Sequence, residues 1–275
     1  MSKNLIPAQR RKLIQEYLTT RKIASIADLS GLVDTSEATI RRDLEWLENE
    51  GLLERTYGGA ILNQRINLES AYEQRVTSYP EEKRLIGEHA ASLIEDGDII
   101  FINSGTTTAQ IFHYIPKDAR ITVLTNNTIA AFEIGGDIGY EIVLLGGTLN
   151  NKVNAVTGSL TVSNLSQIYA DKTFFGVDGI SLKFGCTVPT NPEAEIVRTM
   201  IARTRGLVAV VTDHSKWGLV SNYEVAKVDQ IHKLITDDGI DAGAYDALVS
   251  QSVDVVITNP QKNGSSVFAT KGGRI

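Results

Sequence analysis

Polar turns near the middle of the chain have residue types and spacing that suit anion binding. Residues 104–108 read Ser-Gly-Thr-Thr-Thr and directly follow an apolar run. A glycine and threonine hydroxyls at a strand-to-helix turn present backbone N–H groups and side-chain donors to an anion. Similar polar turns follow later apolar runs, at 126–128, 146–148 and 213–216. Each alone is equally typical of a helix cap, a tight turn or a solvated lysine, but together they predict one ligand pocket.

A second group of candidate residues lies on a predicted helix at 36–49. Ile40, Leu44 and Leu47 repeat at i, i+4 and i+7, which predicts a buried stripe. Arg42 falls opposite that stripe, with Ala38 beside it and Thr39 and Arg41 on its flanks. Arginines and a threonine on the outer N-terminal half are typical of a recognition helix that reads DNA bases in the major groove. A three-helix bundle with a solvated basic face would give the same local pattern.

Metal and catalytic arrangements find little support in the sequence. The four histidines are far apart, and none has metal-ligand spacing with the single cysteine, Cys186. Ser104 lacks the G-x-S-x-G context of a nucleophile elbow. Cys186 follows Gly185 in a predicted turn without a defined base, which favours a structural role. We therefore predict no metal, no cofactor and no catalytic residue.

The elements that must position the candidate DNA-contacting residues lie within about the first sixty residues. Helices are predicted at 8–20, 25–33 and 36–49, the last capped by Ser36, and a β-hairpin wing is predicted at 52–62. The basic cluster Arg10, Arg11 and Lys12 is expected on the side of the first helix that does not pack, whereas Leu13, Ile14, Tyr17 and Leu18 are expected on its packed face. Arg55 and Tyr57 in the wing are candidates for phosphate or sugar contacts.

The rest of the chain alternates helical patches with short apolar runs. The runs are 98–103, 121–126, 141–145, 172–177, 207–212, 233–236 and 253–258. Continuous apolar runs are expected of parallel strands covered on both faces, so we predict an α/β domain with helices on either side of the sheet. The expected organisation is a DNA-binding domain at 7–62, a linker at 63–80, a ligand-binding domain at 81–258 and a tail at 259–275.

Charge and composition narrow the function classes. Residues 1–62 hold nine basic and nine acidic residues, and the remainder carries the whole net charge of −6. A DNA-binding face must therefore arise from local clustering within the first module. No run approaches the length of a membrane helix, the N-terminus lacks a signal-peptide pattern, and one cysteine fits a reducing compartment. We expect a cytoplasmic protein.

The two candidate regions together resemble one known family. Its N-terminal pattern is met by Ser36-Glu37-Ala38-Thr39-Ile40-Arg41-Arg42-Asp43-Leu44, then Leu47-Glu48, then Tyr57-Gly58-Gly59-Ala60. Further matches include Glu82-Lys83, the polar turns described above, and the segments at 175–180 and 211–216. This chain is similar to the DeoR/GlpR family of bacterial regulators from about residue 6 to residue 258. The candidate DNA-binding residues are Ser36, Ala38, Thr39, Arg41, Arg42, Arg55 and Tyr57.

The resemblance implies a winged helix-turn-helix followed by a sensor domain that resembles ribose-5-phosphate isomerase and coenzyme A transferases in fold. Such domains bind phosphorylated sugars without turning them over. Carried across, Thr106, Thr107, Thr108 and Lys216 would hold the phosphate, and Asp178 and Asp213 would read hydroxyls. Ser104, Gly105, Asn126, Gly146 and Gly147 would complete the pocket. Asn103 departs from the aspartate that the family often carries there.

The function expected from these patterns is repression of a carbohydrate-utilisation operon, relieved by a phosphorylated sugar. The partners would be double-stranded operator DNA and further copies of the chain, as a dimer or tetramer. The alternative is a sugar-phosphate isomerase or transferase with an accessory DNA-binding module. Isomerisation needs a positioned general base, and residues 146–150 supply no carboxylate pair for that role.

Overall fold

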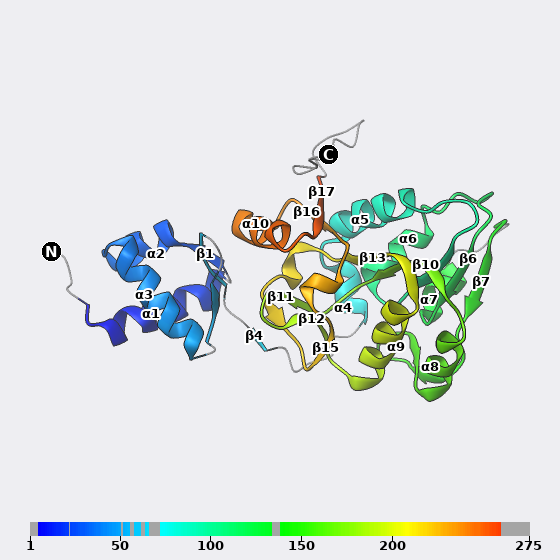
Figure 1. Ribbon diagram of the computed structural model, residues 1–275, viewed down its shortest axis with the longest axis horizontal. Coiled ribbons are helices and arrows are strands. Elements are labelled where there is room, and N and C mark those ends of the chain that lie inside the picture. The colour runs from blue at the N-terminus through cyan, green and yellow to red at the C-terminus, as the bar shows by residue number, and fades with distance from the viewer. Residues whose placement is uncertain are drawn as a thin grey trace.

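The N-terminal module combines helices with a small antiparallel sheet (Figure 1). The computed structural model describes residues 5–21, 23–50, 52–55, 58–61, 64–65, 72–133 and 138–259. The elements of this module are α1 (Pro7–Arg21), β1 (Ile23–Ser25), α2 (Ile26–Val33), α3 (Glu37–Asn49), β2 (Glu54–Arg55) and β3 (Gly59–Ile61). Each predicted helix and the hairpin wing are confirmed. The strand β1, which pairs with β3, was not predicted, because three residues show no readable alternation.

Side-chain caps set the helix boundaries in this module. Ser25 and Asp28 form a capping box at the start of α2, with Asp28 N donating to Ser25 Oγ at 3.1 Å and Ser25 N donating to Asp28 Oδ2 at 3.2 Å. Ser36 caps α3 by accepting from the Thr39 backbone N–H. Asp34, at φ 48°, ends α2 in the left-handed region and creates the turn between the two helices.

The module has its own core, formed by apolar side chains of all its helices. The stripe Ile40, Leu44 and Leu47 is fully buried together with Ile14 and Leu18 of α1. The expectation that Leu13 packs with them is wrong, since its side chain is 36% exposed. Gly59 is needed where β3 meets β1, because a Cβ there would lie 2.0 Å from the Ala24 carbonyl oxygen.

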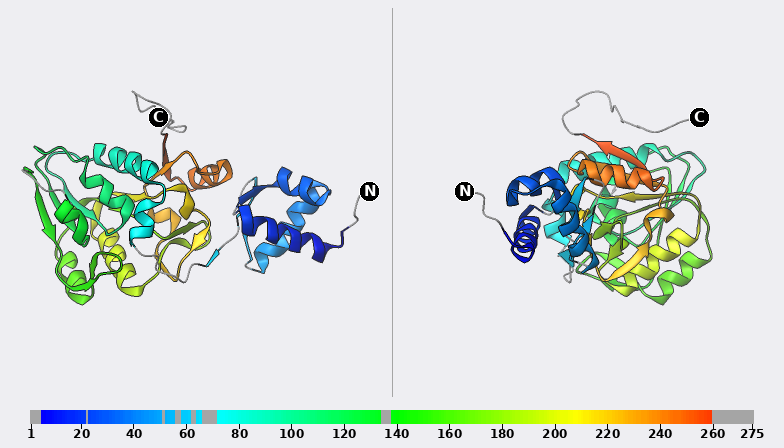
Figure 2. Two further views of the ribbon diagram at one scale, coloured as in Figure 1. Left: turned by 180° about the vertical axis from the view of Figure 1, so that it is seen from behind. Right: turned by 60° about the vertical axis from the view of Figure 1, so that its left-hand side comes forward.

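Two described elements lie in the segment between the two modules. β4 (Gln64–Arg65) pairs in parallel with β14 (Leu219–Val220), and α4 (Tyr72–Thr77) packs near α6 (Thr106–Phe112). In the left-hand view of Figure 2, β4 lies between the helical module and the larger domain. The segment at 63–80, predicted as a partly helical linker, thus contains a helix and a strand that contact the larger domain.

The larger domain is built on a parallel sheet with the order β17-β16-β13-β10-β5-β6-β7. Its strands are β5 (Ile99–Ile102), β6 (Thr122–Thr125), β7 (Glu141–Leu144), β10 (Ala170–Phe175), β13 (Thr204–Val211), β16 (Lys233–Asp237) and β17 (Asp254–Thr258). All neighbouring pairs are parallel. Every predicted apolar run therefore overlaps one strand of this sheet, which confirms the predicted α/β class.

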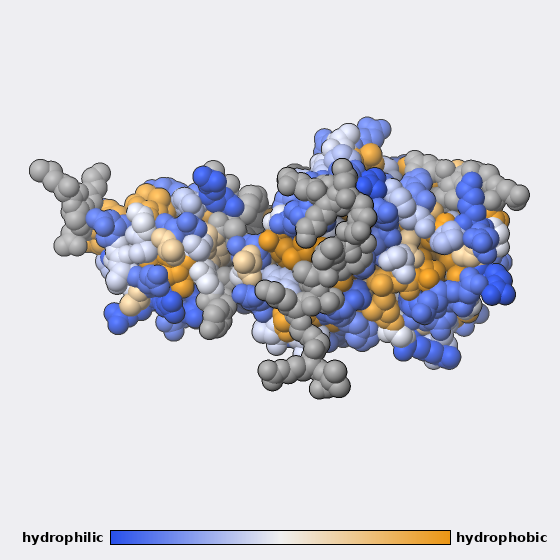
Figure 3. All heavy atoms as spheres, turned by 90° about the horizontal axis from the view of Figure 1, so that it is seen from above, coloured by the Kyte–Doolittle hydropathy of each residue, from blue (hydrophilic) through white to orange (hydrophobic). Residues whose placement is uncertain are grey.

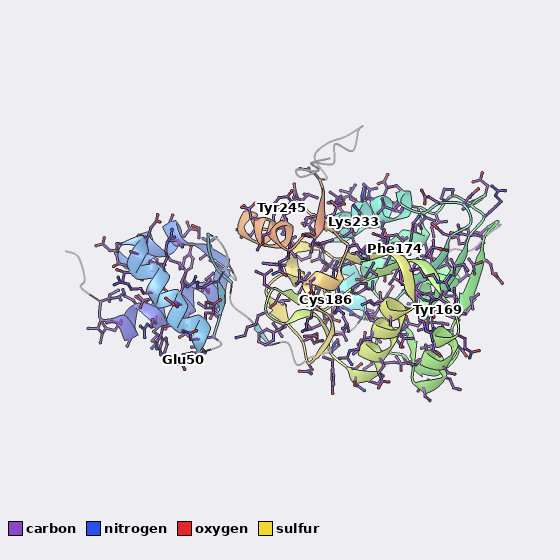
Figure 4. The ribbon with its side chains drawn as sticks, viewed as in Figure 1. Glu50, Tyr169, Phe174, Cys186, Lys233 and Tyr245 are labelled. Carbon is purple, nitrogen blue, oxygen red and sulfur yellow. The ribbon has the colours of Figure 1, made fainter. Side chains whose placement is uncertain are left out.

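Helices cover both faces of the sheet, which explains why the strands are apolar throughout. The helices are α5 (Pro80–Ser92), α6, α7 (Thr128–Glu133), α8 (Ser159–Ser166), α9 (Asn191–Ala202) and α10 (Ala242–Ser250). Side chains of α5 and α6 pack with Ile100 and Phe174, whereas those of α8 and α9 pack with Phe101. Phe174 lies at the middle of the sheet in Figure 4.

Several short elements escaped the sequence analysis. β8 (Thr148–Asn150) and β9 (Ala155–Thr157) form a hairpin, and β11 (Gly179–Ser181), β12 (Gly185–Val188) and β15 (Tyr223–Ala226) form a second antiparallel sheet. Two 3-10 turns, η1 (His214–Lys216) and η2 (Val228–Gln230), complete the described elements. On the face of the molecule that Figure 3 shows, hydrophilic residues alternate with separate groups of apolar residues. None of the described helices has the length and apolar character that crossing a bilayer requires.

Candidate functional site

The exposed face of α3 carries the residues predicted to contact DNA. Ser36, Ala38, Arg41 and Arg42 are exposed, and Thr39 is half-buried. Arg41 Nη2 lies 3.4 Å from Glu37 Oε2, whereas Arg42 makes no hydrogen bond or ion pair with the described residues. The structure thus brings these side chains together on one open surface.

The start of α3 is fixed by its own hydroxyl groups. Ser36 Oγ lies 3.0 Å from Thr39 Oγ1 and accepts from the Thr39 backbone N–H at 3.3 Å. This cap orients the first turn of α3, from which a recognition helix would contact base edges.

The wing lies beside α3 and is tied to it. The Arg55 backbone N donates to Glu48 Oε1 at 3.1 Å, and Arg55 Nε lies 3.7 Å from Glu48 Oε2. Arg55 is therefore positioned next to the predicted recognition helix. Tyr57, the other predicted wing contact, lies outside the described residues.

The basic cluster at the start of α1 has a different role from the one predicted. Arg10 Nε donates to Asp43 Oδ2 at 2.8 Å, and Arg11 Nε donates to Asp43 Oδ1 at 3.0 Å. Asp43 is only 2% exposed, and the guanidinium of Arg11 also lies 4.2 Å from the ring centroid of Trp46. The expectation that Arg10 and Arg11 face away from the packed side is wrong, because they neutralise a buried carboxylate of α3. Lys12 is exposed, as expected.

A cavity of about 260 Å³ opens at the carboxyl ends of the central strands. It brings together many of the residues predicted for the ligand: Ser104, Gly105, Thr106, Thr107, Asp178, Asp213 and Lys216. These residues follow β5, β10 and β13, which are adjacent in the sheet. Parallel strands place their carboxyl ends at one edge, and the topology therefore assembles the cavity from segments far apart in sequence.

The 104–107 turn is held in place by two asparagines. Asn126 Oδ1 accepts from the Ser104 backbone N at 2.8 Å, and Asn126 Nδ2 donates to the Val156 carbonyl at 3.1 Å. Asn103 exchanges two hydrogen bonds with Gly176, accepting at 2.9 Å and donating at 3.2 Å. The amide of Asn103 uses both its donor and its acceptor here. An aspartate could not donate to Gly176 unless it were protonated.

The remaining residues predicted for the pocket, Thr108, Asn126, Gly146 and Gly147, do not line this cavity. Thr108 is fully buried, and its hydroxyl donates to the Asn103 carbonyl at 2.8 Å. Asn126 acts behind the cavity wall by holding Ser104. Gly146 and Gly147 form a turn against α8, where the Gly146 carbonyl accepts from the Thr161 hydroxyl at 2.9 Å. A Cβ on Gly147 would lie 2.6 Å from the Thr157 carbonyl oxygen, so this glycine serves packing.

Charged groups of both signs line the cavity. The cationic residues are Arg75, Lys83 and Lys216, and the acidic residues are Asp178, Glu193 and Asp213. Lys83 is 4% exposed, and its Nζ donates to the carbonyls of Arg75 and Ser78, each at 2.5 Å. Burial lowers the pKa of Lys83, Asp213 raises it in part, and Lys216 and Arg75 lower it further.

Sequence analysis missed several of these lining residues. Arg75 lies in the segment predicted as a linker, and it reaches the cavity only through tertiary packing. Lys83 was noted as part of a motif without a role. Glu193, buried at the start of α9, lies close to the Thr190 hydroxyl at 3.3 Å. The apolar periodicity that follows Glu193 predicts a helix, but it does not indicate that the Glu193 side chain faces the cavity.

A histidine–aspartate pair lies at the cavity margin. His214 Nδ1 lies 2.6 Å from Asp237 Oδ2, and the Tyr79 ring meets the His214 ring edge-on with centroids 4.7 Å apart. The hydrogen bond to Asp237 raises the pKa of His214, although burial opposes this. Burial raises the pKa of Asp237, but hydrogen bonds from the His214 ring and backbone lower it overall. In the described ranges, no cluster of His, Cys, Asp and Glu side chains is arranged to hold a metal ion.

Two family models match the two modules. The model of the DeoR-like helix-turn-helix domain matches residues 10–65, and that of the DeoR C terminal sensor domain matches residues 78–238.

Similar proteins cover nearly the whole chain. The chain is 33% identical over 252 residues to the HTH-type transcriptional regulator GlpR of Haloferax volcanii, covering 92% of this chain and 98% of that protein. It is 33% identical over 250 residues to the HTH-type transcriptional repressor GlcR of Bacillus subtilis, covering 91% and 96%. Among solved structures, ribose 5-phosphate isomerase A of Methanocaldococcus jannaschii is similar with a TM-score of 0.36 and 14% identity, covering 51% of this chain and 55% of that one.

Proposed function

Because this chain belongs to the DeoR family of helix-turn-helix transcriptional regulators, we propose that it represses a carbohydrate-utilisation operon and releases its operator when a phosphorylated sugar binds. The observation that carries the proposal is the cavity in which a hydroxyl-rich turn, Lys216 and carboxylates converge. Such a site offers an anion-binding end and a hydroxyl-binding end within one space. The name of the similar GlcR protein, a transcriptional repressor, supports repression over activation.

The operator contacts are proposed on α3 and the wing. Arg42 has no partner among the described residues, so its guanidinium is free to reach a base edge. The ion pair of Arg41 with Glu37 is solvent-exposed and therefore weak, and DNA phosphate or guanine would displace it readily. Ser36, Ala38, Thr39 and Arg55 flank these arginines, and Tyr57 is proposed to join them.

The phosphate is proposed at the turn formed by Ser104, Gly105, Thr106 and Thr107. The first N–H groups of α6 have no acceptor within the helix, and they lie beside threonine hydroxyls. Because α6 has only seven residues, the turn donors and Lys216 matter more than the helix dipole. Each charge-assisted hydrogen bond would contribute about 1.5–3 kcal/mol.

The carboxylates are proposed to read sugar hydroxyls. Asp178 lines the cavity from the loop after β10, and Asp213 from the loop after β13. Carboxylates accept hydrogen bonds from hydroxyls and repel a second phosphate. A ligand with one phosphate and several hydroxyls therefore matches the charge pattern of the lining.

The test pairs phosphorylated with free sugars. Glucose 6-phosphate, fructose 1-phosphate and ribose 5-phosphate, each beside its free sugar, would be tested by calorimetric binding and by release of an operator selected from random DNA. We expect one of these phosphates to bind and to release the operator, while its free sugar does neither. Thr107→Ala and Lys216→Ala should lose the response, and Lys183→Ala, an exposed lysine outside the cavity, should retain it. If no phosphate binds, or if all three variants behave like the wild type, the proposal fails.

Oligomeric state and the absence of turnover are also part of the proposed function. We propose that the protein is a cytoplasmic homo-oligomer, a dimer or tetramer, that binds repeated half-sites, and that the cavity binds its ligand without converting it. A solution mass equal to the 30.0 kDa monomer, with and without operator, would contradict the assembly. Turnover of any bound sugar phosphate would contradict the absence of catalysis.

A further inference from the structure

Arg75 reaches the cavity from outside the sensor sheet. It lies on α4, which follows β4 in the segment between the two modules. Its side chain is 15% exposed, and Nη1 lies 3.4 Å from Asp178 Oδ1. The Nε atom is buried and has no hydrogen-bond partner among the described residues. Because a guanidinium carries five N–H donors, this side chain retains donors for a ligand in the cavity that it lines.

The position of Arg75 is fixed by its neighbours. Lys83 Nζ donates to the Arg75 and Ser78 carbonyls at the C-terminal end of α4. At the other end, the Tyr72 backbone N donates to the Lys152 carbonyl at 3.2 Å. Lys83 is thus engaged in holding α4, and the side chain of Arg75 is the cation that this helix presents to the cavity.

The contact between the Arg75 guanidinium and the Asp178 carboxylate is long. A separation of 3.4 Å between Nη1 and Oδ1 is longer than the 2.7–2.9 Å typical of charge-assisted hydrogen bonds. A buried donor without an acceptor is costly, so an anion that satisfies Nε and replaces this long contact would bind favourably. A planar guanidinium matches the oxygens of a phosphate in a two-point geometry.

We propose that Arg75 is a further ligand-binding residue. Its guanidinium exchanges the Asp178 carboxylate for the phosphate of the effector, and the Asp178 carboxylate then accepts a hydrogen bond from a sugar hydroxyl. The inference rests on the proposed function of the cavity. It narrows the ligand class to molecules that carry a phosphate and a hydroxyl on one frame. Inorganic phosphate can attract Arg75 but leaves Asp178 without its cation, so it should bind far more weakly.

Movement of the Arg75 side chain from Asp178 to the phosphate would act on the segment that leads to the DNA-binding module. α4 carries Arg75, and β4 earlier in the same segment pairs with β14, which begins three residues after Lys216. Gly179, the neighbour of Asp178, packs on this strand, since a Cβ there would lie 2.2 Å from the Leu219 carbonyl oxygen. Both cations proposed to hold the phosphate are therefore connected to the ends of the 64–77 segment.

The test compares Arg75→Ala and Arg75→Lys with a matched control, Arg84→Ala. Arg84 lies on α5 and pairs with the exposed acids Glu81 and Glu88 outside this cavity. The full-length variants would be titrated with glucose 6-phosphate, fructose 1-phosphate, ribose 5-phosphate and inorganic phosphate, by calorimetry and by operator release. Arg75→Ala should weaken binding of the sugar phosphate that the wild type recognises by about tenfold or more. Arg75→Lys should lose less, and Arg84→Ala should match the wild type.

A second variant keeps the inference testable if Arg75→Ala disturbs folding. Asp178→Asn removes the competing carboxylate, so inorganic phosphate should bind this variant more tightly than the wild type, and the gain should vanish in Asp178→Asn/Arg75→Gln, which has no cation at position 75. Unchanged sugar-phosphate affinity in Arg75→Ala, or a gain that persists in the double variant, would overturn the role of Arg75 and leave the proposed function intact. Failure of every sugar phosphate to bind the wild type would overturn both.

Discussion

Replacing Asp43 by asparagine should destabilise the DNA-binding module and leave the stability of the sensor domain unchanged. The Asp43 carboxylate is 2% exposed and accepts hydrogen bonds from Arg10 Nε at 2.8 Å and Arg11 Nε at 3.0 Å. Asparagine has nearly the same volume, so the substitution removes the charge without creating a cavity. Two guanidinium groups would then face a neutral amide that also presents its own N–H donors.

The expected loss is comparable with the whole stability of the module. Removing one partner of a buried ion pair costs about 3–5 kcal/mol. The side chains of Arg10 and Arg11 are 14% and 24% exposed and can turn partly into water, which reduces the expected cost to about 2–4 kcal/mol. A module of roughly 55 residues has a free energy of unfolding of about 3–8 kcal/mol.

Scanning calorimetry on the full-length protein measures this directly, because the two modules have separate cores. The transition of the N-terminal module should fall by at least about 8 °C, and operator binding should be lost at temperatures above it. Glu37→Gln is the matched control, since its ion pair with Arg41 is exposed on the same helix and contributes little. An Asp43→Asn protein that melts within about 2 °C of the wild type would refute this account of the buried carboxylate.

Four other substitutions test three separate parts of the structure. Arg42→Ala and Arg41→Ala should each weaken operator binding by about 1–3 kcal/mol in gel shifts without lowering the melting temperature. Wild-type affinity in both variants would show that α3 does not bind in the major groove. Gly147→Ala should lower the melting temperature, because Gly147 has a φ of 153° and a Cβ there would clash with a backbone oxygen. Ligand affinity should stay unchanged, and a change in affinity would indicate that this turn contacts the ligand. Asp237→Asn should destabilise the protein more near about pH 5.5 than near about pH 9. The pKa of His214 is raised by its hydrogen bond to Asp237, so this pair stabilises the fold below the ordinary pKa of 6.5, and the stabilisation is lost as the pH rises through the folded pKa. An equal loss of stability at both pH values would contradict the pairing.

The strands of the sheet could be predicted because each contains a short run of mainly apolar residues. Ile99–Ile102 has helices over both faces, so its sequence shows burial without alternation, and the polar turn after it marks the carboxyl end of the strand. β8, β9 and β14 have only two or three residues each, too few for any periodic pattern. Their positions depend on tertiary pairing that the local sequence does not encode.

The cavity was predictable to the extent that it follows strand ends. Residues 104–107, Asp213 and Lys216 directly follow strands, whereas Arg75 is 103 positions from Asp178 in sequence and meets it only through packing. Asp43 shows the same limit within the first module. Its sequence neighbours do not indicate that it faces α1, because its direction depends on how the two helices cross.

The pairing of β4 with β14 has a consequence for exchanging modules between regulators. A parallel pair of two residues on each side depends on a matching backbone geometry more than on particular side chains. A chimaera joined before residue 64 would keep β4 with its own β14, whereas one joined between 65 and 72 would pair a foreign strand with this sensor domain. We expect the first design to retain ligand control over a new operator and the second to bind DNA without responding to ligand. The junction between the modules is therefore part of the sensor.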